Sequence, residues 1–285
     1  MTNNDEDRTL NLPNDTDLPF FAYGIFKPGQ LAYSKIRNLV KRHYEHEIDY
    51  MMLMRDGVPL IAPEQNNYDK TRGNLIYFID GCSRKAYEII SKSEDERLYR
   101  WEEIKVGQNR ANVLMGVRPR KGSTPIEGRL GDYDGKNDPY FKEAIEVVES
   151  ELNDESKHWS SMNDFFHLQM SYLLLWTAIE RYASLKYNCP RVGQKWKKLS
   201  GEETFIDSLK RHVQNKRKVY SADELREYTL NPEKPYYSIK YYYTIRCNAA
   251  HRGKALHSDD YIIRQSLKEL LEIFKDILED SFKTD

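Results

Sequence analysis

Cysteine is scarce in this chain of 285 residues: Cys82, Cys189 and Cys247 are an odd number and form no CxxC pair. Such usage fits a reducing cytoplasm and argues against a disulfide framework or a cysteine-based zinc site. The seven histidines show no metal-ligand spacing, so we expect no metal and no cofactor. Long apolar runs are lacking too, because none approaches the ~18 residues of a membrane-spanning helix. The sequence therefore predicts a cytoplasmic protein with no membrane partner.

The chain also lacks a large net charge, since its 44 Lys and Arg residues are balanced by 45 Asp and Glu residues. The distribution is nevertheless uneven. Residues 1–17 are acidic and polar, unlike a secretory signal, and we expect a disordered tail there. Residues 191–218 are basic, and two interpretations stay open for them: a footprint for RNA phosphates, or a solvated loop between helices. The cations of this stretch are Arg191, Lys195, Lys197, Lys198, Lys210, Arg211, Lys216, Arg217 and Lys218.

Length predicts two domains, which we place at residues 18–150 and 158–283 with a polar linker between them. An α+β fold class is what the two family resemblances given below imply. In the second domain, apolar side chains recur every three or four residues, which indicates the buried faces of two long helices. The first face follows residues 161–164 and comprises Phe165, Leu168, Tyr172, Leu175, Trp176, Ile179 and Tyr182. The second follows residues 258–260 and comprises Ile263, Leu267, Leu270, Leu271, Phe274, Ile277 and Leu278. A further amphipathic helix opens at Asp138-Pro139, just before the linker.

Between the two long helices lies the segment Arg246-Cys247-Asn248-Ala249-Ala250-His251. Arginine supplies a permanent, forked cation that suits phosphate oxygens. Histidine can give or take a proton near neutral pH. Together the two residue types suffice for metal-free RNA cleavage, in which a 2′-hydroxyl is activated, the leaving oxygen is protonated and the developing charge is neutralised. The alternative interpretation is a pair of solvated side chains in a charged helix.

A helix that contains residues 174–180, an Arg-x4-His motif and a long last helix together resemble the HEPN superfamily. Its members are helical bundles, many of them dimeric ribonucleases or toxins of defence and toxin–antitoxin systems. The resemblance covers about residues 158–282. It implies that Arg246 and His251 are catalytic, that Asn248 assists them, and that the domain forms a homodimer and binds RNA. The expected RNA-binding cations are Lys195, Lys197, Lys198, Arg252 and Lys254.

Helix geometry limits how the Arg-x4-His motif can work. Five residues turn an ideal helix by about 500°, so Arg246 and His251 would point roughly 140° apart. They share a pocket only if the helix ends or bends between them, or if two chains contribute to one site. Gly253, just beyond His251, is a helix-stop signal. We predict that a single chain with an unbroken helix does not form this site.

The first domain opens with residues 18–30, which predict a strand that runs into a loop containing Gly24, Pro28 and Gly29. Glycine lets the backbone approach a ligand closely, because no Cβ intervenes. The segment resembles the Tyr-Gly-x-Leu-x-x-Gly opening of the gamma-glutamylcyclotransferase-like fold, a small mixed β-barrel. Residues 57–61, 72–80 and 89–106 resemble, in order, the family's second segment, its central strand and its helix-to-strand segment. The resemblance spans about residues 18–148.

That resemblance implies an active site built from few residues. A carboxylate takes a proton from the α-amine of a γ-glutamyl compound, the amine attacks its own γ-carbonyl, and loop amides hold the oxyanion. Glu94 is the implied acid/base, and the implied substrate-binding residues are Tyr23, Gly24, Ile25, Phe26 and Tyr99. Two pairs, Ile25-Phe26 and Ile90-Ser91, depart from the family pattern. The alternative for Glu94 is an ordinary solvated charge run over residues 94–97.

Three functions follow from these features. The leading expectation is a metal-independent endoribonuclease, a toxin or defence effector, whose first domain senses or modifies a ligand. The first alternative is a cyclotransferase that acts on γ-glutamyl amines or peptides, with a helical domain that serves only for dimerisation. The second alternative is a non-catalytic binding protein in both halves. Toxicity on overexpression would favour the ribonuclease, and release of 5-oxoproline from γ-glutamyl compounds would favour the cyclotransferase.

Overall fold

The computed structural model describes residues 10–63, 69–126, 128–154, 157, 161–187, 189, 191–221, 226–251 and 260–283. The fold is α+β with mixed strand directions. The chain divides into two compact units, the first ending at Gly135 and the second running from Lys136 to Lys283. Among the described residues, no helix has both the length and the apolar character that crossing a bilayer requires.

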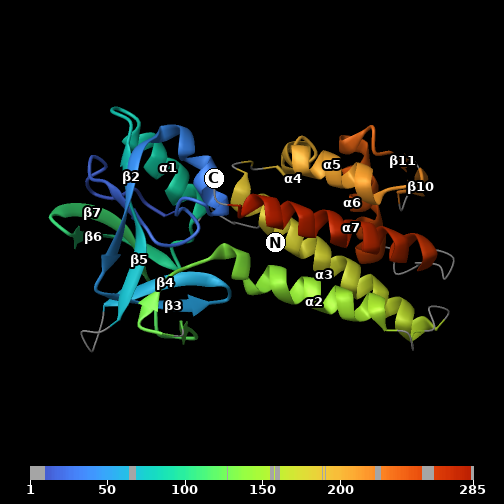
Figure 1. Cartoon of the computed structure of the whole chain (residues 1–285), viewed down its shortest axis with the longest axis horizontal. Helices are drawn as coiled ribbons and strands as arrows, with labels where there is room; N and C mark the ends of the chain where they lie inside the picture. Colours follow the sequence, from blue (N-terminus) through green and yellow to red (C-terminus); the bar gives the residue numbers. More distant parts are fainter. Residues whose placement is uncertain are drawn as a thin grey trace, which may run out of the picture. The chain divides into compact units, whose positions relative to one another are not determined.

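The first unit contains two sheets and the helix α1 (Ser83–Ser93) (Figure 1). β1 pairs antiparallel with β5 and parallel with β7, so the larger sheet is mixed. The strand order in the larger sheet is β2 (Val40–Ile48), β5 (Lys70–Phe78), β1 (Phe20–Ala22), β7 (Asn109–Gly116) and β6 (Tyr99–Val106), with β9 (Leu130–Gly131) added to β5. The smaller sheet has the order β4 (Val58–Pro63), β3 (Tyr50–Arg55) and β8 (Thr124–Pro125). Two 3₁₀ helices, η1 (Leu31–Lys35) and η2 (Arg37–Leu39), connect β1 to β2.

Aromatic rings anchor α1 on the larger sheet. The ring of Tyr87 lies edge-on to Phe78 and Trp101, at centroid distances of 5.4 and 5.3 Å. Its hydroxyl donates a hydrogen bond of 2.8 Å to the carbonyl of Leu18. α1 ends at Ser93, and Glu94 follows in an extended conformation. The anchored helix therefore delivers Glu94 to a defined place at the edge of the core.

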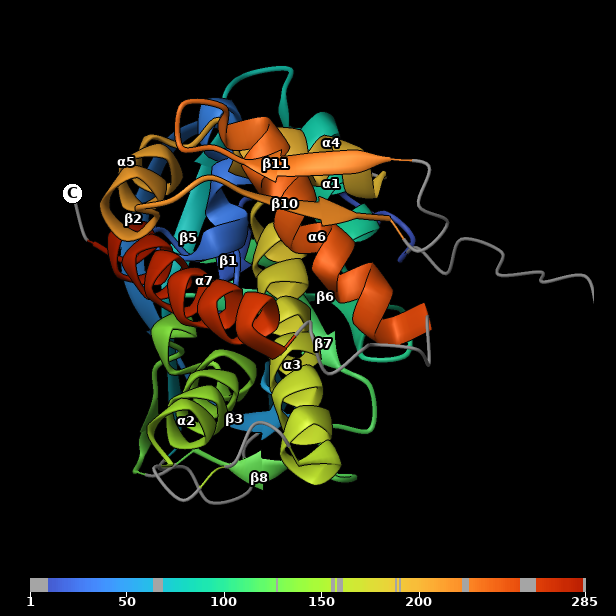
Figure 2. The same cartoon turned by 90° about the vertical axis from the view of Figure 1, so that its right-hand side faces the viewer.

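The second unit is mainly helical, and its helices α2, α3 and α7 run alongside one another (Figure 2). Two predicted helix starts are confirmed. The side chain of Ser161 accepts a hydrogen bond from the Asp164 N–H at 3.1 Å, and that of Asp138 accepts one from the Tyr140 N–H at 3.0 Å. The elements are α2 (Pro139–Asn153), α3 (Met162–Lys186), α4 (Val192–Leu199), α5 (Glu203–His212), the hairpin β10 (Arg217–Tyr220) and β11 (Glu227–Leu230), α6 (Pro235–His251) and α7 (Asp260–Ser281).

The core of the second unit confirms the predicted helix faces. All seven apolar residues predicted for α3 are buried, as are those of α7 except the half-buried Leu278. The core also contains a buried ion pair between Arg217 of β10 and Glu269 of α7. The Tyr242 hydroxyl donates to the same carboxylate at 3.2 Å. Because these charges are paired and hydrogen-bonded, their burial is tolerated.

The structure differs from the sequence prediction at two places. α2 belongs to the second unit, where Phe141 packs against Phe274 of α7 with ring centroids 5.9 Å apart. The boundary between the two units therefore lies before α2 in the sequence, and not at the predicted linker. The interpretation of residues 191–218 as a solvated loop is wrong, because they form α4, α5 and the first half of β10. The reason is a short apolar periodicity, since Trp196 and Leu199 of α4 and Phe205 and Leu209 of α5 are buried.

Candidate functional site

Residues from separate segments of the first unit surround one small cavity of about 20 Å³. Every residue that the cyclotransferase resemblance implies lies in its wall, although the residues come from the turn after β1, the end of α1 and the start of β6. The lining residues are Phe20, Ala22, Tyr23, Gly24, Ile25, Phe26, Glu94, Tyr99 and Leu114. The fold thus brings together the six predicted residues Tyr23, Gly24, Ile25, Phe26, Glu94 and Tyr99.

Backbone hydrogen bonds shape the turn after β1. The Lys27 N–H donates to the Gly24 carbonyl at 2.9 Å, and the Ala32 N–H donates to the Ile25 carbonyl at 3.1 Å. A Cβ on Gly24 would lie 2.9 Å from Cγ of Pro59. The close approach that Gly24 permits is therefore to Pro59 of β4, and this contact holds the turn against the smaller sheet.

The two tyrosines of the cavity act as fixed walls. The Tyr23 hydroxyl donates to the Leu114 carbonyl at 2.6 Å, and the Tyr99 hydroxyl donates to the Pro59 carbonyl at 2.7 Å. Burial raises the pKa of both hydroxyls well above the usual value, and the neighbouring Glu94 raises the pKa of each further. Both phenols therefore stay neutral, and their protons are already committed to backbone carbonyls.

The carboxyl group of Glu94 has an unusual protonation equilibrium. Burial raises its pKa from 4.5 to about 8, while Lys35 lowers it and Asp95 raises it. Lys35 is the last residue of η1, and its Nζ donates to Oγ of Ser93 at 3.3 Å. Glu94 is half-buried and lines the cavity, whereas Glu96 is exposed, so the run over residues 94–97 is not uniformly solvated. Glu94 can therefore exchange a proton near neutral pH.

The turn also carries unused backbone donors. Within the described residues, the N–H groups of Gly24, Ile25 and Phe26 form no hydrogen bond. Such donors stabilise an oxyanion when they face the reacting carbonyl. A proton-exchanging carboxyl group beside unbonded amides is an arrangement that suits acyl transfer.

The Arg-x4-His motif lies on α6, which continues unbroken from Pro235 to His251. Arg246 lies 3.9 Å from Glu180 of α3, measured from Nη2 to Oε1, and its guanidinium lies 5.9 Å from the ring centroid of Tyr243. Asn248 donates from Nδ2 to the Tyr220 carbonyl at 2.8 Å, so it ties α6 to the hairpin. The side chain of His251, and the predicted RNA-binding residues Arg252 and Lys254, lie outside the described residues.

The unbroken helix removes one of the options for this motif. α6 does not end between Arg246 and His251, and on an ideal helix two positions five residues apart are separated by roughly 140° around the axis. A site formed by both residues within one chain is therefore not supported. The remaining option is a site to which two chains contribute.

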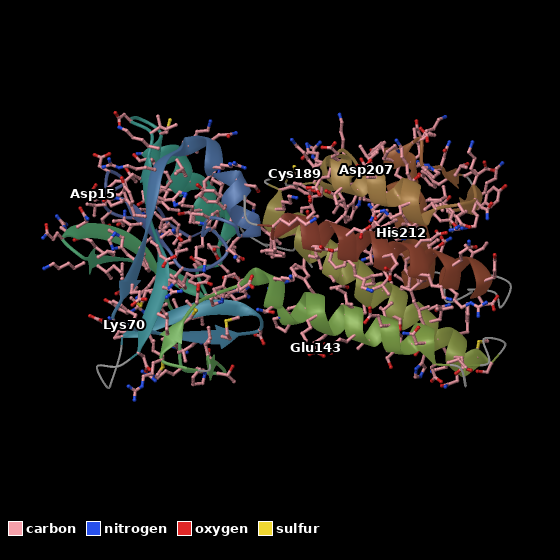
Figure 3. The ribbon with its side chains drawn as sticks, in the orientation of Figure 1. Asp15, Lys70, Glu143, Cys189, Asp207 and His212 are labelled. Carbon is pink, nitrogen blue, oxygen red and sulfur yellow. The ribbon has the colours of Figure 1, made fainter. Side chains whose placement is uncertain are left out.

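Only part of the basic stretch is available for RNA. Lys197 and Lys198 are exposed on α4, while Lys195 donates to Oγ of Ser184 at 2.8 Å. Arg217 is buried in its ion pair with Glu269. On α5, which also carries Asp207 and His212 (Figure 3), Arg211 lies 3.1 Å from the carboxylate of Asp276. The patch therefore offers fewer unpaired cations than its sequence indicates.

Aromatic residues of the second unit mostly build its core. Tyr241 and Tyr242 are fully buried, and Trp196 is nearly so. These side chains cannot stack on the bases of an RNA, because they are buried in the core of the second unit. Tyr237 is more than half exposed.

Lys35, which lowers the pKa of Glu94, could not be predicted from the sequence, because no motif marks it and only the fold brings η1 to the end of α1.

No group of three or more His, Cys, Asp or Glu side chains in the described part of the chain is arranged to hold a metal ion. Comparisons with protein-family models, with curated proteins and with solved structures return no match.

Proposed function

We propose that the first unit is a gamma-glutamylcyclotransferase-like barrel in which Glu94 is the acid/base of an intramolecular acyl transfer. One observation carries this proposal: Glu94, with its pKa raised to about 8, shares a cavity with a turn whose N–H groups are unbonded. Perturbed carboxyl groups in enclosed sites are typical of acid–base catalysts. This order of preference reverses the sequence-based expectation, which put the ribonuclease first.

The proposed reaction needs no group beyond those in the cavity. Ionised Glu94 takes a proton from the substrate's α-ammonium group, and the freed amine attacks the γ-carbonyl carbon to close a five-membered ring. The N–H groups of residues 24–26 stabilise the resulting oxyanion. The oxyanion then collapses, the bond to the leaving nitrogen breaks, and protonated Glu94 gives its proton to that nitrogen. The carboxylate, ionised again, takes the second proton from the positively charged ring nitrogen and passes it to the released amine, which leaves as an ammonium ion. The products are 5-oxoproline and a free amine or peptide.

The proposal is tested by incubating the full chain at pH 8.5 with γ-glutamyl amines and γ-glutamyl peptides. Chromatography with mass detection then measures the 5-oxoproline released. Release above the spontaneous rate supports the proposal. No release from any member of the panel would leave the first unit as a ligand-binding domain.

Replacing Lys35 should change the titration of Glu94. Lys35→Met removes the cation that favours the ionised carboxylate, so the pKa of Glu94 should rise above about 8 by roughly one pH unit. The carboxyl carbon of Glu94 can be followed by ¹³C NMR across a pH titration, with Glu94→Gln to assign its signal. Lys92→Met, an exposed lysine of α1, is the matched control. An unchanged midpoint in Lys35→Met would mean that this lysine does not act on the carboxyl group.

A second candidate function has its own supporting observation. α3 carries apolar side chains that face solvent at four-residue intervals, opposite its buried face: Met162 (51% exposed), Phe166 (54%), Met170 (67%) and Leu174 (38%). We call these four residues the α3 stripe. An exposed apolar stripe of this length is typical of a protein–protein interface. The ion pair between Glu180 of α3 and Arg246 lies six residues beyond Leu174 on the same helix.

The second candidate is therefore a HEPN bundle that dimerises through the α3 stripe and forms a ribonuclease site from Arg246 and His251 of two chains. In a dimer, Arg246 of one chain and His251 of the other can contribute to one site. An ideal helix does not allow this within one chain, because positions five residues apart lie on different faces. Its RNA contacts would come from Lys197 and Lys198, which are exposed. In this account the first unit modifies or senses a small γ-glutamyl ligand. A role as toxin or defence effector requires this second activity.

A charge in the α3 stripe should separate the dimer. Met170→Glu places a carboxylate at the most exposed position of the stripe, where burial against a second chain would be costly. Analytical ultracentrifugation at micromolar concentration should show two copies for the wild type and one for Met170→Glu. Tyr261→Glu, an exposed aromatic residue of α7 that is 58% exposed, is the matched control and should stay dimeric. A monomeric wild type would contradict the composite site.

A further inference from the structure

The cavity around Glu94 is too small for the substrate that its chemistry requires. A cavity of about 20 Å³ has room for about one water molecule. A γ-glutamyl group must place its α-amine, its γ-carbonyl and its α-carboxylate near this point. If a γ-glutamyl compound is the substrate, part of the wall has to move before it enters.

The walls differ in how firmly they are held. Phe20 and Ala22 belong to β1, which is paired on both sides, by β5 and by β7. Glu94 follows α1, which Tyr87 anchors by its ring contacts and by its hydroxyl. The segment from residue 24 to residue 30 belongs to neither sheet nor helix. It is the part of the wall that can move without breaking a strand pair.

Side chains attach this segment to residues 132–135. Lys27, whose side chain is only 14% exposed, forms an ion pair with Asp132 and donates to the Tyr133 carbonyl at 2.9 Å. Gln30 accepts a hydrogen bond from the Gly135 N–H at 2.8 Å. Asp132 also lies 3.6 Å from Arg72 of β5, so the carboxylate is anchored to the sheet. Two polar side chains thus hold the segment at points three residues apart, in addition to the buried ring of Phe26, which lies edge-on to Phe20 at a centroid distance of 6.4 Å.

We propose that residues 24–30 form a lid over the Glu94 cavity, and that Lys27 and Gln30 latch it to residues 132–135. This inference rests on the proposed function for the identity of the substrate and for the need to open, whereas the motion itself is tested below without any substrate. The latch has two opposite effects on the reaction. Closure aligns the N–H groups of Gly24, Ile25 and Phe26, whereas it also shuts the substrate out. Lys27 and Gln30 are therefore positioning residues, which act through the lid.

Breaking the latch should leave a kinetic signature that a general loss of stability does not. Lys27→Met removes the ion pair and the bond to Tyr133, so the open form becomes more populated. Since apparent affinity scales with the populated fraction of the competent form, KM should fall. kcat should fall as well, because the oxyanion donors are less well aligned. A variant that is merely less stable would lose active protein, which lowers the apparent kcat at unchanged KM.

Hydrogen exchange tests the motion without any substrate. In the full chain, Lys27→Met should speed exchange of the hydrogen-bonded amides of Gln30 and Ala32 by about tenfold or more, because a charge-assisted bond no longer opposes opening. Exchange in β6 and β7 should not change. Gln30→Leu should act in the same direction, and Lys27→Arg, which keeps the cation, should restore slow exchange. Asp80→Asn removes an exposed ion pair with Lys41 and is the matched control.

The outcomes separate the latch from the catalytic proposal. Faster exchange in Lys27→Met and Gln30→Leu, with slow exchange in Lys27→Arg and Asp80→Asn, supports the latch even if no γ-glutamyl compound reacts. Unchanged exchange at Gln30 and Ala32 in both latch variants would overturn it, even if 5-oxoproline is released. Faster exchange throughout the first unit would also overturn it, because Lys27 would then support the whole unit and not the lid.

Discussion

Glu94→Gln should lower the release of 5-oxoproline by about 10²–10⁴-fold, the usual effect of a lost acid–base group. The amide has nearly the shape of the carboxyl group, but it cannot take a proton from the substrate's α-amine. KM should change little, because the walls of the cavity and the lid remain in place. Glu96→Gln changes an exposed residue two positions away and should retain full activity. Equal activity of the wild type and Glu94→Gln would show that the base is another residue.

The same substitution should alter how stability depends on pH. Folding raises the pKa of Glu94 from 4.5 to about 8, so its contribution to stability is fully present below pH 4.5 and is lost as the pH rises through about 8. The wild-type first unit should therefore become less stable between pH 5 and pH 9, whereas Glu94→Gln lacks this loss. At pH 9, urea denaturation should show the variant to be more stable by roughly 2–4 kcal/mol. A difference of the opposite sign would contradict the raised pKa.

The second large effect concerns RNA cleavage by the second unit. His251→Ala removes proton transfer and Arg246→Ala removes the phosphate cation, so each should lower cleavage by about 10²-fold or more. The double variant should be little worse than either single one, because both residues would serve one transition state. Cleavage should persist in EDTA, and products should carry 2′,3′-cyclic phosphate ends. Arg84→Ala and His43→Ala, at exposed sites of the first unit, are the controls.

Two results would contradict this second candidate. Metal-dependent cleavage that leaves 5′-phosphates would mean a different mechanism. Full activity of His251→Ala would mean a different residue. A helical unit that dimerises without cleaving RNA would leave the second unit as an assembly module for the first.

The long helices of the second unit could be predicted because their apolar periodicity is extended and their starts are marked. Ser161 and Asp138 bind backbone N–H groups as their sequence positions predict. α4 and α5 could not be predicted in the same way, since each is short and its lysines and arginines dominate the local composition. The place of α2 depends on the contact of Phe141 with Phe274, far along the chain, so the unit boundary could not be read locally.

The members of the candidate site could be predicted, but its physical properties could not. Glu94 stands in a charged sequence that indicates solvent exposure, and only the fold surrounds it with Tyr23, Tyr99 and Lys35. Its raised pKa is a property of this tertiary environment. The closed cavity and the latch between Lys27 and Asp132 likewise depend on residues about 100 positions apart in sequence. For Arg246 and His251, helix geometry could be predicted from their spacing, and the structure adds that α6 does not end between them.

The pH dependence of 5-oxoproline release by the wild-type chain tests the central claim most directly. If Glu94 must be ionised to accept the proton, the rate should rise with pH and level off above about 8, the pKa that burial imposes on this carboxyl group. The assay should use γ-glutamyl substrate well below KM, so that the profile follows kcat/KM and reports the free enzyme, with spontaneous cyclisation subtracted at each pH. Release that is constant from pH 6 to pH 9, or no release at any pH, would contradict the account.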